Sequence, residues 1–253
     1  MPNTKITKQK WKDHYSYSKK IYFFGILVAV GLASLIFSVT RYIPDNAHAV
    51  LIQFVDAYIN TTNLEEDIQP LLEIGQEYDE TLEEIQFLSI NYTGEGTSEN
   101  DYYGAQVYSV QIYAGDNDIF IQNEKLTQSM IDQGFLMPLE ELDEFAAFNA
   151  KYPDAVLWRE EPSEEGEEED EDAPARPVHA YAVDISSMYG LAERGAYDMR
   201  EKYAGIMVTS ENASTSFHVL SEMFEYFKPS EPIPVQENAE EAIDETQEAV
   251  TEP

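Results

Sequence analysis

The sequence predicts an α/β domain that follows a single membrane-spanning helix. Residues 21–40 form an apolar run without a charge, and predicted strands alternate with predicted helices between residues 85 and 150. Such alternation is typical of a mainly parallel sheet flanked by helices. We therefore expect four parts: a cytoplasmic basic segment at 1–20, a transmembrane helix at 21–43, an extracytoplasmic α/β domain at 44–228 and a disordered acidic tail at 229–253.

The apolar run, IYFFGILVAVGLASLIFSVT, has the length and the flanks of a transmembrane helix. At about 1.5 Å per residue it spans roughly 30 Å, the thickness of the hydrocarbon core of a bilayer. Lys19 and Lys20 precede it and Arg41 follows it. A buried core helix rarely lacks a polar face over such a length. The lipid bilayer is therefore the first expected partner. Aromatic rings lie at the depths that they prefer in a membrane: Tyr22, Phe23 and Tyr42.

The charges on the two sides of this run predict its orientation. Six lysines and one acid precede it, a balance of +5, whereas the chain from Asp45 onward holds 48 of the 49 acids and 8 of the 15 basic residues, a balance of −40. Short basic flanks stay in the cytoplasm, so the N-terminus is expected inside. A cleaved signal peptide, cut at Ala47-His48-Ala49, is the alternative; its apolar region is usually only about 7–15 residues long.

One face of the predicted membrane helix consists of small residues. Gly25, Ala29 and Ala33 follow one another at intervals of four. Such a face lets two helices approach closely, which makes a helix-mediated homodimer an expected form of self-association.

Composition limits the classes of function. The chain has no cysteine, which excludes disulfides, thiolate zinc sites and a lipid-modified cysteine. An exported domain without disulfides fits a bacterial cell envelope, and only a eukaryotic route would use the glycosylation triplets at Asn60, Asn91 and Asn212. The negative charge repels nucleic acid and anionic lipid. It favours cations, basic proteins or simply solubility.

In the first part of the domain, AHAVLIQFVDAYI at 47–59 is expected to be an amphipathic helix, since its apolar residues recur at helical spacing. Asn63 begins a second helix, with Glu66 three residues later as in a capping box. Residues 85–92 are rich in β-formers and predict a strand.

The alternation of strands and helices follows. A helix at 99–114 is expected to end at Gly115, a buried strand occupies 118–122, and a helix at 124–133 is stopped by Gly134. Pro138 precedes a further helix at 139–150.

Residues 160–177 consist largely of acids and prolines, so we expect a solvated loop. A calcium site is the alternative for this loop, but the ligand spacing of an EF-hand loop is missing. Strands are predicted at 178–186 and 204–210, separated by a segment that is helical or irregular with a glycine break. A helix at 213–227 closes the domain, and the residues beyond it lack an apolar period.

The segment GDNDIFIQNEKLTQSMIDQGFLMPLEEL, at 115–142, resembles the extracytoplasmic solute-binding proteins of ATP-driven importers. That family commonly shows a glycine-aspartate turn, a strand beginning Asp-Ile or Asp-Val, a short helix, and Gly-x-Leu-x-Pro-Leu. The later segments YAVDISSMYGL and YAGIMVTSENASTSFHVLSEMFEYF are similar to its second-lobe strand and its closing strand and helix. The matching positions of the first segment are Gly115, Asp118, Ile119, Gly134, Leu136, Pro138 and Leu139.

Members of this family are usually longer, with two lobes around a ligand cleft, and many are tethered by a lipid-modified cysteine. This chain has a helical anchor instead, and its acidic loop stands where much of a second lobe would lie. The resemblance therefore implies a reduced or degenerate, membrane-anchored member of the family.

Polar residues at the carboxyl ends of the predicted strands are the candidate ligand contacts, because ligands bind at that edge in open α/β sheets. These residues are Gln122, Asn123, Tyr181 and Asp184. Asp116 and Asp118 flank an asparagine before a strand, and we interpret them as turn formers.

No constellation of catalytic residues is evident in the sequence. There is no nucleophile elbow and no phosphate loop. The histidines lack the spacing of metal ligands; they are His14, His48, His179 and His218. We expect a protein that is not an enzyme, with no catalytic residue, metal or cofactor, while an extracellular hydrolase has no support. Its domain is expected to bind a protein or another envelope component. The alternative is a small-ligand receptor that serves an importer or a sensor.

Overall fold

The structure, a computed structural model, describes residues 7–40, 45–96, 99–162 and 176–228. It divides into two compact units, residues 1–43 and 44–253. The predicted tail at 229–253 and the central part of the predicted acidic loop at 160–177 lie outside the described residues.

The first unit contains one helix, α1, from Lys8 to Thr40. Its part from Lys19 to Thr40 is long and apolar enough to cross a membrane, a property that signal sequences share. None of this part is buried inside the structure. The helix begins at Lys8, well before the predicted span.

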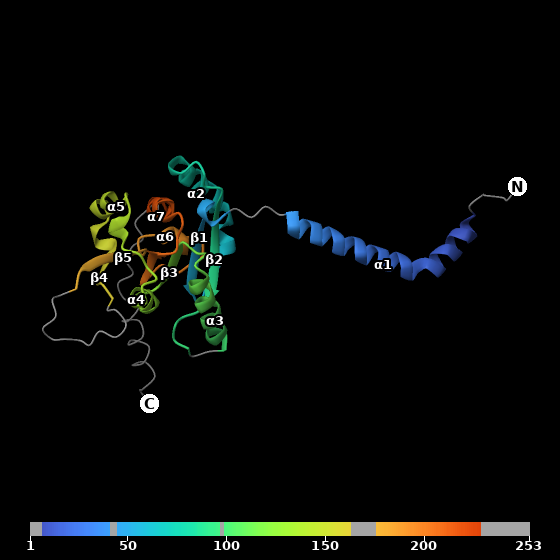
Figure 1. Cartoon of the computed structure of the whole chain (residues 1–253), viewed down its shortest axis with the longest axis horizontal. Coiled ribbons are helices and arrows are strands. Elements are labelled where there is room, and N and C mark those ends of the chain that lie inside the picture. Colours follow the sequence, from blue (N-terminus) through green and yellow to red (C-terminus); the bar gives the residue numbers. More distant parts are fainter. Residues whose placement is uncertain (1–6, 41–44, 97–98, 163–175, 229–253) are drawn as a thin grey trace, which may run out of the picture. The chain divides into compact units, whose positions relative to one another are not determined.

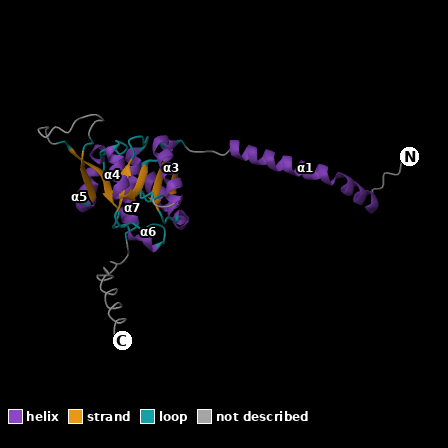
Figure 2. Cartoon of the chain, turned by 90° about the horizontal axis from the view of Figure 1, so that it is seen from below, coloured by secondary structure: helices purple, strands orange, loops and turns teal. Residues whose placement is uncertain are grey.

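The second unit is built on a six-stranded sheet with helices packed around it (Figure 2). The strands follow the order β2-β1-β3-β6-β5-β4 (Figure 1). Their bounds are β1 Ala49–Asp56, β2 Glu84–Asn91, β3 Ile119–Asn123, β4 Val156–Glu160, β5 Val178–Asp184 and β6 Lys202–Ile206.

The prediction of a mainly parallel sheet holds for only half of this sheet. β1 pairs in parallel with β2 and β3, whereas the pairs β3–β6, β6–β5 and β5–β4 are all antiparallel. Parallel neighbours require crossover connections, which α2 and α3 supply in the first half. In the second half, β4 and β5 follow one another along the chain as antiparallel neighbours. The sequence pattern predicts no strand at the position of β4.

The prediction of a helix at 47–59 is wrong, because this run contains β1, a strand inside the sheet. Ile52 lies opposite Phe87 of β2 on one side and Ile119 of β3 on the other. Val50, Ile52 and Phe54 pack into the core on one face of the sheet, and Val55 packs into the core on the other. A strand buried on both faces is apolar nearly throughout, so its pattern overlaps with that of a helix.

The bounds of most helices agree closely with the prediction, and those of α3 agree at both ends. The region predicted as one helix at 139–150 is instead a short 3₁₀ turn, Leu139–Glu141, followed by α5. Gly115 and Gly134, expected to end two helices, both have positive φ angles, 71° and 69°. The helices are α2 Glu65–Tyr78, α3 Glu99–Ala114, α4 Glu124–Asp132, α5 Phe145–Lys151, α6 Tyr189–Glu193 and α7 Ala213–Tyr226.

The sheet separates two hydrophobic cores. One face is covered by α2, α5, α6 and α7, and the other by α3 and α4. β3 contributes to both, since Ile119 and Ile121 enter the first core and Phe120 enters the second. Such two-sided burial explains why β3 is apolar without alternation.

Asp118 holds the amino-terminal edge of the sheet together. Its carboxylate accepts hydrogen bonds from the backbone N–H of Leu51, at 2.8 Å, and from the hydroxyl of Ser210, at 2.6 Å. Burial raises the pKa of Asp118 to about 6, although both hydrogen bonds act in the opposite direction. Asp116 is exposed and accepts from the side chain of Asn46 at 3.2 Å. Both aspartates therefore have contacts within the fold.

Candidate functional site

The carboxyl edge of the sheet holds the candidate site. β1, β2, β3 and β5 run in one direction, because β3 and β5 are both antiparallel to β6. The chain moves from β1 outward to β2 and then crosses back to β3, so the connections diverge between β1 and β3. In open α/β sheets, ligands bind beyond the carboxyl ends of the strands at such a switch point.

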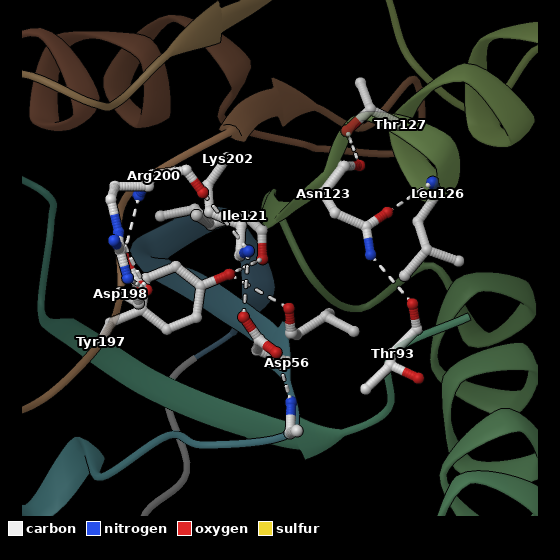
Figure 3. Close-up of polar contacts among 12 residues, drawn as sticks. Asp56, Thr93, Ile121, Asn123, Leu126, Thr127, Tyr197, Asp198, Arg200 and Lys202 are labelled. Atoms are coloured by element: carbon white, nitrogen blue, oxygen red, sulfur yellow. Dashed lines mark hydrogen bonds and ion pairs between the residues drawn. The ribbon is translucent and has the colours of Figure 1, made fainter. Parts of the chain in front are cut away.

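An ion pair occupies this position. The Nζ atom of Lys202, at the start of β6, lies 3.0 Å from Oδ2 of Asp56, at the end of β1 (Figure 3). The exposed fractions of the two side chains are only 14% and 22%. Oδ1 of Asp56 also accepts a hydrogen bond from the backbone N–H of Ala57, at 2.5 Å. Both charges at the switch point are therefore neutralised within the chain.

Tyr197 lies at the ends of β1 and β3. Its hydroxyl lies 3.0 Å from the carbonyl oxygen of Val55 and 3.2 Å from that of Ile121 (Figure 3). Its ring packs against Phe54, with centroids 5.0 Å apart. Burial raises the pKa of Tyr197 well above its ordinary value. The hydroxyl is thus a neutral donor that joins the ends of β1 and β3.

Gln122 and Asn123, predicted as ligand contacts, make hydrogen bonds inside the domain. Gln122 is buried: its Oε1 accepts from the hydroxyl of Tyr108 at 2.7 Å, and its Nε2 lies 2.9 Å from Sδ of Met130. Asn123 caps α4 by accepting from the backbone N–H of Leu126 at 2.9 Å. Its Nδ2 donates to the carbonyl oxygen of Thr93 at 2.9 Å, as Figure 3 shows.

Tyr181 and Asp184, the other two predicted contacts, lie on β5 and are separated from β3 by β6. Tyr181 is a buried member of the core beneath α3 and α4. Asp184 accepts from the backbone N–H of Ser186 at 2.8 Å and lies opposite Tyr203 in the sheet. The four predicted residues do not form one constellation, and their role as ligand contacts stays a prediction.

A groove of about 630 Å³ lies beside the ion pair, between the loop after β1 and the segment before β6. Its lining is mostly apolar. Tyr58 is 88% exposed. The lining residues are Ala57, Tyr58, Ile59, Asn60, Ala192, Gly195, Ala196, Tyr197, Asp198, Met199 and Arg200.

The charged pair in this groove is Asp198 and Arg200. Nε of Arg200 lies 3.0 Å from Oδ1 of Asp198, and Nη2 lies 2.7 Å from Oδ2. These hydrogen bonds lower the pKa of Asp198. The Arg200 side chain is 79% exposed, so its outer surface stays accessible. Sequence reasoning missed this groove, because nothing local in GAYDMREK indicates that it adjoins the end of β1.

Two further arginines of the domain are also paired. Arg194 makes two hydrogen bonds to the buried carboxylate of Asp67, at 2.7 and 2.9 Å, and thereby joins α2 to the end of α6. Arg159 of β4 lies 2.6 Å from Oε1 of Glu124 in α4. Across the described part of the chain, no three histidine, aspartate or glutamate side chains come together as metal ligands would.

Comparisons with known proteins add one distant similarity. No protein-family profile and no curated protein matches the chain. Among solved structures, it is similar to a TRAP periplasmic solute-binding protein from Ochrobactrum anthropi whose C-terminus is bound in its ligand-binding pocket. Identity is 10%, the TM-score is 0.27, and the match covers 80% of this chain and 79% of that one. A similarity of this size supports no argument about function.

Proposed function

We propose that the chain is a single-pass membrane protein whose extracytoplasmic, non-enzymatic domain binds a protein partner in the groove beside Tyr58. The charge balance supports the orientation, with +5 before the apolar run and −40 after it. The same negative charge favours a partner with a basic surface, because complementary charge accelerates and directs association.

The proposal rests on the polar groups at the ends of β1 and β3, which bind one another beside an open groove. Tyr197 and the pair of Asp56 and Lys202 fill the crevice between β1 and β3. A site for a small solute needs convergent polar groups, and here those groups bind one another. Beside that crevice, an apolar groove remains open, with Tyr58 and Arg200 exposed. Tyrosine, arginine and methionine are enriched at the anchors of protein interfaces.

The second candidate function is a small-ligand receptor. The position of the groove favours it, since the groove adjoins the carboxyl end of β1. A small ligand in that groove would contact Asn60 or the backbone of the loop after β1.

Site-specific cross-linking tests the proposal in cells that express the full chain. A photo-reactive phenylalanine analogue at Tyr58 should give a discrete adduct with another protein, and Arg200→Ala should reduce its yield. The same analogue at Glu77, an exposed position on α2, is the matched control. Equal yields at both positions would contradict the proposal.

A thermal-shift screen of the full chain in detergent tests the alternative, with amino acids, sugars and dicarboxylates as probes. A solute at 100 times its dissociation constant stabilises by about 2.7 kcal/mol. A stabilisation that disappears in Tyr58→Ala would replace the protein partner with a small ligand.

A further inference from the structure

From Tyr102 to Tyr113 the outer face of α3 is exposed, aromatic and uncharged, while the acids Glu99 and Asp101 lie in the first turn of the helix. After Asp101 the sequence has no charged residue until Asp116, in a chain of which 25% of the residues are charged. Large side chains on this face remain in solvent, with exposed fractions of 49% to 75%. They are Tyr102, Tyr103, Val107, Val110 and Tyr113. Surfaces depleted of charge and enriched in tyrosine are typical of the centre of a protein interface.

The edge of the sheet that β2 forms adjoins this face. β2 is the outermost strand, and no other strand of the described chain pairs with its outer side. α3 lies against the end of β2 (Figure 1): a Cβ atom added at Gly104 would come within 2.1 Å of the carbonyl oxygen of Asn91. A groove of about 310 Å³ runs between them, lined by residues 89–91 and by Tyr103, Gly104 and Val107. Together the outer face of α3 and the edge of β2 form one surface, called here the α3–β2 surface.

We propose that a second copy of this chain covers the α3–β2 surface in a two-fold symmetric dimer. A two-fold interface brings a residue close to the same residue of the other copy only near the axis, where the proposal places Val110. Charged residues near the axis would repel their own copies, so a chain with a net charge of −34 self-associates most favourably through a face that has no charge near the axis. A foreign partner of so acidic a chain would gain most from opposite charges, which this face does not offer.

The edge of β2 suits the same arrangement. Two copies of an edge strand pair in antiparallel fashion around a two-fold axis, which satisfies their open backbone groups. Antiparallel pairing places the start of one β2 beside the end of the other. Glu84, the charged residue of β2, would therefore face the uncharged Asn91 of the second copy. Anchoring in one bilayer further favours the contact, because it confines both copies to the same plane.

The state of association of the full chain in detergent tests this proposal by sedimentation. Val110→Glu should raise the dimer dissociation constant at least about tenfold, because it brings two like charges together at the interface. Val178→Glu, at a residue that is 53% exposed and lies on β5, separated from β2 by three strands, is the matched control and should leave the constant unchanged. Unchanged circular dichroism verifies that both variants fold.

A second variant separates this interface from contacts made by the membrane helix. Since the chain has no cysteine, Val110→Cys should form a disulfide between two copies on mild oxidation, and Val178→Cys should not. A wild-type monomer, or a dimer that survives Val110→Glu without that disulfide, would overturn the proposal. The groove at Tyr58 is a different surface, so cross-linking there should be the same in Val110→Glu as in the wild type.

Discussion

The Nζ atom of Lys202 lies 3.0 Å from Oδ2 of Asp56, which joins β6 to β1 across the end of the strand that separates them, β3. Asn123, the last residue of β3, lies opposite Lys202 in the sheet. The ion pair thus occupies the carboxyl edge of the sheet at the ends of β1 and β3.

The first prediction measures the strength of this pair. Lys202→Met and Asp56→Asn should each lower the free energy of unfolding by about 1–3 kcal/mol, since each leaves a half-buried polar group without its partner. The double variant should cost less than the sum, with a coupling energy of about 0.5–3 kcal/mol. Urea unfolding of the four proteins measures the cycle. Strictly additive losses would show that the two side chains do not interact in solution.

The second prediction concerns the dependence of stability on pH at Asp118. Its pKa rises from the ordinary 3.8 to about 6 in the folded domain, so the folded state binds this proton more tightly. The resulting stabilisation is complete below about pH 3.8 and is lost as the pH rises through about 6. It amounts to about 3 kcal/mol in total.

Asp118→Asn should remove this component, so the variant should gain less stability than the wild type on acidification from pH 7 to pH 4.5. Unfolding curves at several pH values measure the difference between the two proteins. Asp116→Asn, in the same turn but exposed, is the matched control. Parallel profiles for wild type and Asp118→Asn would contradict the argument.

The third prediction tests the central position of β3. Phe120 is 1% exposed and packs with α3 and α4, so Phe120→Ala should lower the free energy of unfolding by about 3–5 kcal/mol. Tyr58→Ala, at a side chain that is 88% exposed, should change it by less than about 0.5 kcal/mol. Denaturant unfolding compares the two. Similar small losses in both variants would mean that β3 is not packed from both sides.

The fourth prediction is the orientation of the anchor. A cysteine at Glu77 of α2 should react with an impermeant thiol reagent on intact cells, and one at Lys12 of α1 should react only after lysis. Both positions are exposed, and the chain has no cysteine of its own to interfere. Labelling in the reverse pattern would invert the proposed topology.

Local signals in the sequence predicted several elements closely. α3 ends at Ala114, immediately before Gly115, and α4 ends at Asp132, two residues before Gly134. Glycine adopts a positive φ at little cost, so it marks a helix end without any tertiary information. β4, at 156–160, carries no such signal, and its partially exposed residues form a strand through pairing with β5.

The geometry of the candidate site depends on long-range contacts more strongly than the ends of the helices do. Asn123 was predicted at the end of a strand, where the structure places it. Its amide, however, is used by Leu126 and Thr93, and Lys202 reaches Asp56 from a distant part of the chain. The position of a polar residue along a strand is local, but its hydrogen-bond partners are decided by which segments meet in space.

By itself, then, the sequence determined an apolar helix with a basic segment before it and an acidic domain after it. It also determined that short strands and helices alternate in that domain. Only the tertiary structure decided that Ala49–Asp56 is a strand. Its apolar residues fit either period, and pairing with β2 and β3 selects the extended form, because a strand between two others satisfies its backbone groups on both sides while both of its faces are buried.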